Sequence, residues 1–249
     1  MPDIKFVNID IESGNQKISN FVASITSGRS LTVVGDKNSG RDALIQGMIG
    51  FIPLLSGSIL VNEEPIHTLP PNQRKIIKIG SDWGLFPHLS VEDNVSFGLR
   101  FHKLSKTEFT EQKETTLKIF GLLDKSKQFC TQLQNFDKFK VALARAAAVS
   151  PNLIILQDPF EAFDINTRLE FLKMISELQR KAGLTLLFST NSPTDYMGIS
   201  TKTAVLANGY LEQYDETQIV HENPSSVLSA RATGEINCIK AQVVMGGDF

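Results

Sequence analysis

The stretch Ser30-Leu31-Thr32-Val33-Val34-Gly35-Asp36-Lys37-Asn38-Ser39-Gly40-Arg41-Asp42 decides the fold of this chain. Its first part, 30–34, is mostly apolar or β-branched and predicts a buried strand. Gly35 and Gly40 frame a short loop, and the apolar residues between Ala43 and Met48 predict a helix directly after it. A strand, a glycine-framed loop and a helix form a P-loop, whose backbone N–H groups bind phosphate at the helix N-terminus. The stretch therefore predicts an α/β fold.

Two positions of this loop depart from the P-loop pattern. The pattern has Lys where this chain has Arg41, and Ser or Thr, whose hydroxyl binds Mg²⁺, where it has Asp42. Arginine keeps the positive charge but is larger and planar. Asp42 puts a carboxylate at the helix N-terminus, where the helix dipole stabilises negative charge. Two interpretations stay open: a loop in which Asp42 mimics the missing anion, or a relic turn that binds nothing.

Short apolar runs alternate with helical patterns along the rest of the chain. Strands are predicted at 59–61, 76–79, 153–156 and 184–190, and helices at 91–99, 108–120, 140–149 and 165–182. Gly183 is placed to end the last helix. Asn208-Gly209 suits a type I′ turn and predicts a hairpin over 204–211. This alternation predicts an α/β core with a parallel sheet.

Composition and charge exclude several classes of protein. The chain has 249 residues, with 25 basic and 27 acidic side chains, and its net charge of −2 argues against binding nucleic acid through bulk charge. Cys130 and Cys238 cannot form a disulfide framework and suit a reducing compartment. We find neither a signal peptide nor a run of about 18 apolar residues, so we expect a cytoplasmic protein that reaches a membrane only through a partner.

Three further segments carry a family resemblance. They are Leu85-Phe86-Pro87-His88-Leu89-Ser90-Val91-Glu92-Asp93-Asn94-Val95-Ser96-Phe97-Gly98-Leu99, Val141-Ala142-Leu143-Ala144-Arg145-Ala146, and Leu156-Gln157-Asp158-Pro159-Phe160-Glu161-Ala162-Phe163-Asp164. The first resembles the segment after the Q-loop of ABC-transporter ATPases, the second the helix after their signature motif, and the third their Walker B strand and D-loop. With the P-loop they stand in the family's order and spacing over nearly the whole chain. Within that family the resemblance points to the spermidine/putrescine-type importer ATPases.

The resemblance implies an α/β P-loop NTPase fold, the ABC-type nucleotide-binding domain, over residues 1–232. A RecA-like core is expected to hold residues 30–86 and those from 152 onward, with strand 153–156 beside strand 30–34. The N-terminal strands are expected in an antiparallel β layer, and a helical lobe is expected at about 87–149. Gly234-Glu235-Ile236-Asn237 resembles the junction to a C-terminal regulatory β domain. Residues 233–249 are therefore expected to be the vestigial start of such a domain.

The resemblance also assigns the site residues. It assigns nucleotide binding to the whole loop from Gly35 to Asp42 and to the signature position. That position reads Leu133, Gln134, Asn135, Phe136 and Asp137. The resemblance assigns Mg²⁺ binding to Asp42 and Gln157. It assigns catalysis to the general-base, switch-histidine and Q-loop positions, which are Asp158, Asn191 and Ser81. ATP and Mg²⁺ are the implied cofactors.

Most of these positions differ from the residues that the family uses. Where the family signature reads Leu-Ser-Gly-Gly-Gln, this chain has the bulky Phe136 and the charged Asp137. The Walker B aspartate is replaced by Gln157, and the general-base glutamate is replaced by the shorter carboxylate of Asp158. The adenine-stacking aromatic expected near Ile11 is missing from the sequence. Phosphoryl transfer relies on positioned charges, and losing one such contact can lower the rate by about 10²–10³-fold. We therefore expect weak or absent ATP hydrolysis.

Two functions stay open. The first is an ATP-binding subunit of an ABC importer for a polyamine-like or related solute, and the second is a non-catalytic pseudo-ATPase that serves in docking or regulation. Both imply a peripheral position on the cytoplasmic face of the membrane. The implied partners are integral-membrane permease subunits and a second ABC ATPase subunit, in a homodimer or heterodimer, and no nucleic acid. An exposed apolar groove beside Trp83, Phe86 and Leu89 is expected to bind the permease. For Trp83 itself two interpretations stay open, a permease contact or a packing residue.

Overall fold

The computed structural model describes residues 2–192, 199–234, 236, 237 and 239. Its strands are β1 (Ile4–Ser13), β2 (Gln16–Ile25), β3 (Ser30–Val34), β4 (Ser56–Val61), β5 (Glu64–Pro65), β6 (Ile76–Ile79), β7 (Leu153–Gln157), β8 (Leu186–Thr190), β9 (Lys202–Ala207) and β10 (Tyr210–Glu216). Its α-helices are α1 (Arg41–Ile49), α2 (Val91–Ser96), α3 (Lys106–Ile119), α4 (Asn135–Ala148), α5 (Ile165–Ala182), α6 (Thr217–Glu222) and α7 (Val227–Thr233). Short 3-10 helices lie at Pro71–Gln73, Gly98–Phe101, Leu123–Lys125 and Cys130–Gln132.

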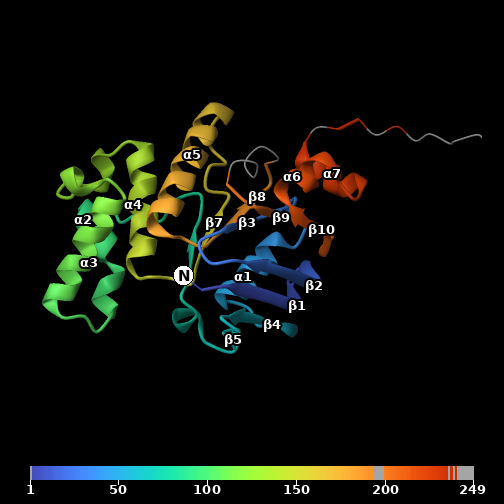
Figure 1. The fold of residues 1–249 in the computed structure, drawn as a ribbon, viewed down its shortest axis with the longest axis horizontal. Coiled ribbons are helices and arrows are strands. Elements are labelled where there is room, and N and C mark those ends of the chain that lie inside the picture. The colour runs from blue at the N-terminus through green and yellow to red at the C-terminus, as the bar shows by residue number, and fades with distance from the viewer. Residues whose placement is uncertain (1, 193–198, 235, 238, 240–249) are drawn as a thin grey trace, which may run out of the picture.

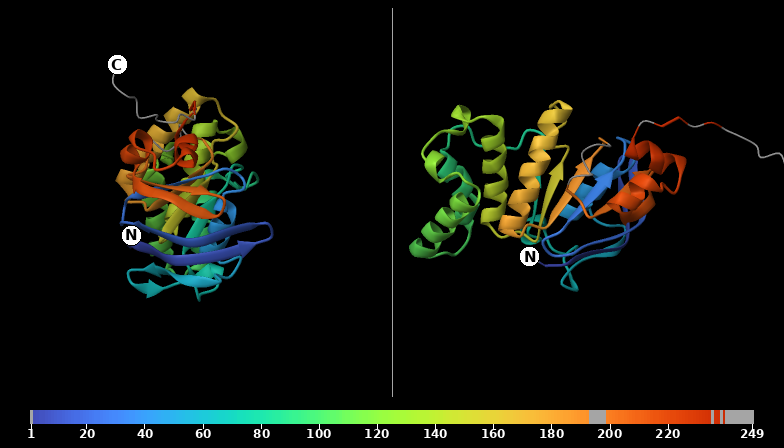
Figure 2. Two further views of the ribbon diagram at one scale, coloured as in Figure 1. Left: turned by 90° about the vertical axis from the view of Figure 1, so that its right-hand side faces the viewer. Right: turned by 45° about the horizontal axis from the view of Figure 1, so that its top comes forward.

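The helices and strands form two parts joined by α5. α2, α3 and α4 pack on one another at one end of the molecule, and the strands with α1 form the other part (Figure 1). α6 and α7 lie at the end away from α2–α4, in the turned view as well (Figure 2). The fold is thus the α/β fold that the sequence predicts, with a group of helices separate from the sheet.

The ten strands form one sheet in the order β5-β4-β1-β2-β10-β9-β3-β8-β7-β6. β9, β3, β8, β7 and β6 run parallel, while β5, β4, β1 and β2 form an antiparallel layer. The prediction that strand 153–156 lies beside strand 30–34 is wrong, because β8 lies between β3 and β7. Leu186 of β8 pairs with Ser30 on one side and with Ile154 on the other. All five residues of β8 are buried, as a central parallel strand requires.

Local turn signals in the sequence are confirmed. Gly183 ends α5 with a φ of 63°, and Asn208 and Gly209 both have positive φ values, as a type I′ turn requires. Gly40 precedes α1 with a φ of 88°, and a Cβ atom there would lie 2.3 Å from the carbonyl oxygen of Lys17. Only glycine fits where the loop passes the β1–β2 hairpin.

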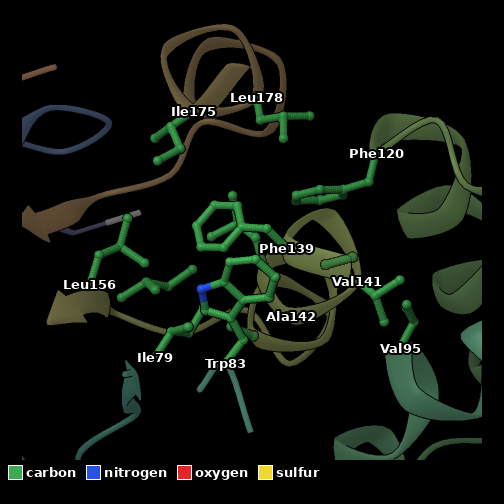
Figure 3. Close-up of a cluster of buried hydrophobic side chains, with 14 of the residues drawn as sticks. Ile79, Trp83, Val95, Phe120, Phe139, Val141, Ala142, Leu156, Ile175 and Leu178 are labelled. Atoms are coloured by element: carbon green, nitrogen blue, oxygen red, sulfur yellow. The ribbon is translucent and has the colours of Figure 1, made fainter. Parts of the chain in front are cut away.

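A cluster of buried apolar side chains joins α2–α4 to the sheet through α5. Trp83 lies in it with Phe139 of α4, Leu156 of β7 and Ile175 of α5 (Figure 3). Trp83 is only 7% exposed, and its ring meets Phe139 edge-on with the ring centroids 5.5 Å apart. The expected exposed groove beside Trp83 is therefore wrong for this residue, because the aromatic ring is used in packing.

The serine just before α2 sets the start of that helix. Ser90 caps α2 by accepting a hydrogen bond from the Asp93 N–H at 3.1 Å. α4 begins at Asn135, earlier than the predicted 140, so Asn135, Phe136 and Asp137 of the signature position lie in its first turn.

Two remaining expectations concern the membrane and the C-terminal segment. Among the described residues, no helix is both long and apolar enough to cross a bilayer. Thr233 is the last residue of α7. The expected start of a β domain at 233–249, like Cys238, lies mostly outside the described residues.

Candidate functional site

The P-loop lies at the carboxyl ends of the parallel strands. Residues 35–40 connect β3 to α1, and the chain leaves β7 and β8 at the same edge of the sheet. Ligands of open α/β sheets bind at this edge. Arg41, Asp42, Gln157 and Asp158, which the sequence assigns to the site, meet here.

Arg41 is paired with the carboxylate at the general-base position. Its Nη1 donates to Asp158 Oδ1 at 2.8 Å and to Ser189 Oγ at 3.0 Å. The side chain of Arg41 is 5% exposed and that of Asp158 is 18% exposed, so the ion pair is largely shielded from water. Arg41 Nε is buried without a hydrogen-bond partner in the described part of the chain. Arg41, at the position of the P-loop lysine, and the carboxylate of the base position therefore neutralise each other.

The two predicted metal positions bind each other. Gln157 Nε2 donates to Asp42 Oδ1 at 2.7 Å, and Gln157 Oε1 accepts from Lys78 Nζ at 3.2 Å. Gln157 therefore links a carboxylate on α1 to an ammonium group on β6. A neutral amide can do this because it has both a donor and an acceptor. An aspartate at the same place has no donor and would repel Asp42.

These residues do not fit Mg²⁺. The ion is usually bound through one or two carboxylates together with waters and phosphate oxygens. Here the Asp42 carboxylate accepts from an amide N–H, and the Asp158 carboxylate accepts from a guanidinium. In the residues that the structure describes, there is no group of three or more His, Cys, Asp or Glu side chains that could hold a metal ion.

The loop also satisfies three of its own backbone donors. Asp36 Oδ1 accepts from the Asn38 N–H at 2.8 Å, and the Asp36 carbonyl accepts from the Ser39 N–H at 3.2 Å. Ser39 is fully buried, and its Oγ accepts from the Arg41 N–H at 3.4 Å. N–H groups that a P-loop offers to phosphate are here used by oxygen atoms of the loop.

The signature position is built into the helices. The Phe136 ring stacks on the Phe171 ring of α5, with centroids 4.2 Å apart. Asp137 forms ion pairs with Lys125 and Lys140. Burial alone would raise the pKa of Asp137, but these two lysines outweigh it and hold the pKa below its usual value. The new bulk and charge in this segment both have partners within the same chain.

Ser81 and Asn191 remain outside this network. Both are exposed, and no described hydrogen bond links either of them to the Arg41–Asp158 pair. Asn191 follows β8 and lines a hollow of about 410 Å³ with Asp36 and Arg231 of α7. The structure thus joins the P-loop and Walker B positions by hydrogen bonds and places the switch position beside the P-loop, outside that network. No described hydrogen bond links the Q-loop position to the network.

Trp83 connects the segment near Phe86 to the turn after Asp158. Its Nε1 donates to the Pro159 carbonyl at 3.0 Å, and its own carbonyl accepts from Arg145 at 3.1 Å. The Arg145 guanidinium lies 4.9 Å from the centre of the Phe86 ring. One buried indole therefore fixes the position of both segments.

Sequence reasoning missed three polar residues. Lys78 and Ser189 contact the altered site residues, and the buried Asn94 accepts from the Phe86 N–H and donates to the Phe86 carbonyl, both at 3.0 Å. Lys78 gives a detectable signal, since it is the charged residue in an otherwise apolar strand. Ser189 and Asn94 carry no signal that separates them from ordinary polar residues.

Comparisons with known proteins agree with this fold. A family model described as ABC transporter matches residues 18–161. The chain is 31% identical over 229 residues to the spermidine/putrescine import ATP-binding protein PotA of Thermotoga maritima, covering 92% of this chain and 62% of that protein. It therefore spans less than two thirds of the length of this curated relative. The structure of cbiO1 from Clostridium perfringens, part of the ABC transporter complex cbiONQ, is similar with a TM-score of 0.79 and 22% identity, over 89% of this chain and 91% of that one.

Proposed function

The chain belongs to the ABC transporter family, and on this premise we propose that it is the ATP-binding-cassette subunit of an importer complex and hydrolyses ATP weakly or not at all. An import ATP-binding protein among its relatives supports the importer setting and a polyamine-like or related solute. Within this proposal residues 1–232 are the nucleotide-binding domain and 87–149 its helical lobe.

The observation that carries the impaired hydrolysis is the Arg41–Asp158 ion pair. ATP hydrolysis in this family needs a free cation on the phosphates and a free carboxylate beside the attacking water. The side chains at these two positions lie 2.8 Å apart and bind each other. Separating them exposes two charges that are now shielded, so nucleotide binding must first overcome this attraction.

The helical lobe and the adjoining sheet edge offer apolar surface for a permease. Phe51 and Phe101 are 71% and 78% exposed. Two hollows of about 510 and 390 Å³ share the edge strand residues Ile76 and Ile77, and Phe51 lines one of them. Exposed apolar patches of this kind mark interaction sites. We assign this face to integral-membrane subunits, which hold the chain on the cytoplasmic side of the membrane.

A second ABC subunit completes the proposal. ABC ATPases bind ATP between the P-loop of one subunit and the signature of the other. This chain brings a neutralised P-loop to one such site and the stacked Phe136 to the other. The pair is a homodimer or a heterodimer. A non-catalytic docking or regulatory module is the second candidate, favoured by the Lys78–Gln157–Asp42 link, which needs no ligand.

Steady-state phosphate release by the purified chain, alone and with its partner subunits, tests the proposal. We expect release at background, with Asp158→Asn as the control variant. If the wild type releases phosphate robustly and Asp158→Asn abolishes that release, the proposal of weak or absent hydrolysis is wrong.

Restoring the family residues gives a graded test of the same point. Arg41→Lys with Asp42→Ser removes the carboxylate that competes with phosphate and should improve nucleotide binding first. Turnover should stay low until Gln157→Asp, Asn191→His and Phe136→Gly are added, since residues that act as one unit are strongly non-additive.

A further inference from the structure

Gln16 bridges the two ends of the P-loop. It follows the Gly14–Asn15 turn of the β1–β2 hairpin and is half-buried. Its Nε2 donates to the Lys37 carbonyl at 2.8 Å, and its Oε1 accepts from the Ala43 N–H at 3.3 Å. One side chain therefore holds the tip of the loop and the first turn of α1 at the same time.

The Ala43 N–H is a group that a phosphate would use. Ala43 is the third residue of α1, and the first N–H groups of a helix have no partner inside the helix. Such groups at the end of a glycine-framed loop bind phosphate oxygens. The N–H groups of Asn38, Ser39 and Arg41 already donate to oxygen atoms of the loop. Gln16 adds the helix start to this set.

We propose that Gln16 closes the P-loop against phosphate, and that its amide sets how tightly the loop binds a phosphate-bearing ligand. The inference rests on the proposed function only in taking the loop as the phosphate site. An incoming phosphate must displace the Gln16 oxygen from Ala43 and must also approach the carboxylates of Asp36 and Asp42. Closure by a neutral amide differs from the charge effect at Arg41, because Gln16 occupies a backbone N–H of the helix start and forms no ion pair.

Binding of inorganic pyrophosphate without metal, measured by isothermal titration calorimetry, tests this directly. Gln16→Ala frees the Ala43 N–H and should tighten binding by about 3- to 10-fold over the wild type, the value of one neutral hydrogen bond. Gln16→Ser, whose side chain is too short to reach both partners, should behave alike. Gln16→Glu keeps the acceptor and adds a negative charge, so it should bind more weakly than the wild type.

Gln46→Ala is the matched control. Gln46 lies on the exposed side of α1, and its replacement should leave pyrophosphate affinity unchanged. The urea midpoint of each variant, followed by Trp83 fluorescence, verifies that the proteins compared are folded. If Gln16→Ala and Gln16→Ser bind no tighter than the wild type, or none of the variants binds at millimolar pyrophosphate, the inference is overturned. The phosphate-release assay tests a different claim. Robust turnover there contradicts impaired hydrolysis, whereas the role of Gln16 is tested only by the order of the pyrophosphate affinities.

Discussion

Replacing Asp158 by asparagine tests the ion pair that closes the site. The amide keeps the shape and an oxygen acceptor but removes the charge, so Arg41 remains buried without a counter-charge. Removing one partner of a buried pair costs about 3–5 kcal/mol. Because Asp158 is 18% exposed and asparagine can still accept a hydrogen bond, we expect a loss of about 2–3 kcal/mol in the free energy of unfolding. In a domain of this size the Tm falls by about 4–12 °C.

A double variant separates the charge effect from a loss of shape. Arg41→Met with Asp158→Asn leaves no charge unpaired, and buried pairs replaced by apolar groups of similar size are often tolerated. The double variant should therefore lose less stability than the two single variants together, by about 1–2 kcal/mol.

Urea unfolding followed by Trp83 fluorescence measures these changes, since Trp83 is the single tryptophan and is buried. Glu63→Gln is the matched control, because Glu63 and its ion-pair partner Lys5 have side chains that are 69% and 50% exposed. Its midpoint should not change measurably, as for most exposed pairs. An Asp158→Asn variant as stable as the wild type, with additive effects in the cycle, would refute the role of the ion pair.

Phe136→Ala should lower the free energy of unfolding by about 2–3 kcal/mol, because the half-buried ring stacks on a phenylalanine of α5. Phe136→Leu is the comparison variant, and a Phe136→Ala protein with the same Tm as Phe136→Leu contradicts this. A hydrogen bond from Lys127 is the main cause that lowers the pKa of Glu92 below its usual 4.5. The ionised Glu92 carboxylate therefore stabilises the fold above pH 4.5, and this stabilisation is lost as the pH falls through the lower pKa of the folded state. In Glu92→Gln the urea midpoint should fall less between about pH 5 and pH 3 than it does in the wild type. Phe86→Glu should abolish co-purification with a permease, because the Phe86 ring contacts Phe97, which in turn contacts the exposed Phe101 of the docking face. Val22→Glu, at a 42% exposed position of β2, should not; equal recovery of both variants argues against this face.

The sequence by itself determined the class of fold, the family and the positions that form the loop. Its signals are local: Gly35 and Gly40 frame the turn, Gly183 ends a helix, and Asn208-Gly209 closes a hairpin. Gly40, Gly183 and the Asn208-Gly209 pair do so through positive φ values, which depend on a few neighbouring residues. The sequence also showed which positions differ from the family. It could not show that the altered residues have become partners of one another.

Only the tertiary structure decided those partnerships. Arg41 and Asp158 are 117 residues apart in the chain, and Asp42 and Gln157 are 115 apart. They meet because β3 and β7 run parallel and end at the same edge, with β8 between them to supply Ser189. Periodicity along one strand predicts that the strand is buried but carries no information about which strand lies next to it. For the same reason Trp83 could be recognised as a large apolar residue, while its place in the core depended on two segments distant in sequence. These are α4 with Phe139 and the stretch from Pro159 to Phe171, which the fold brings to the indole.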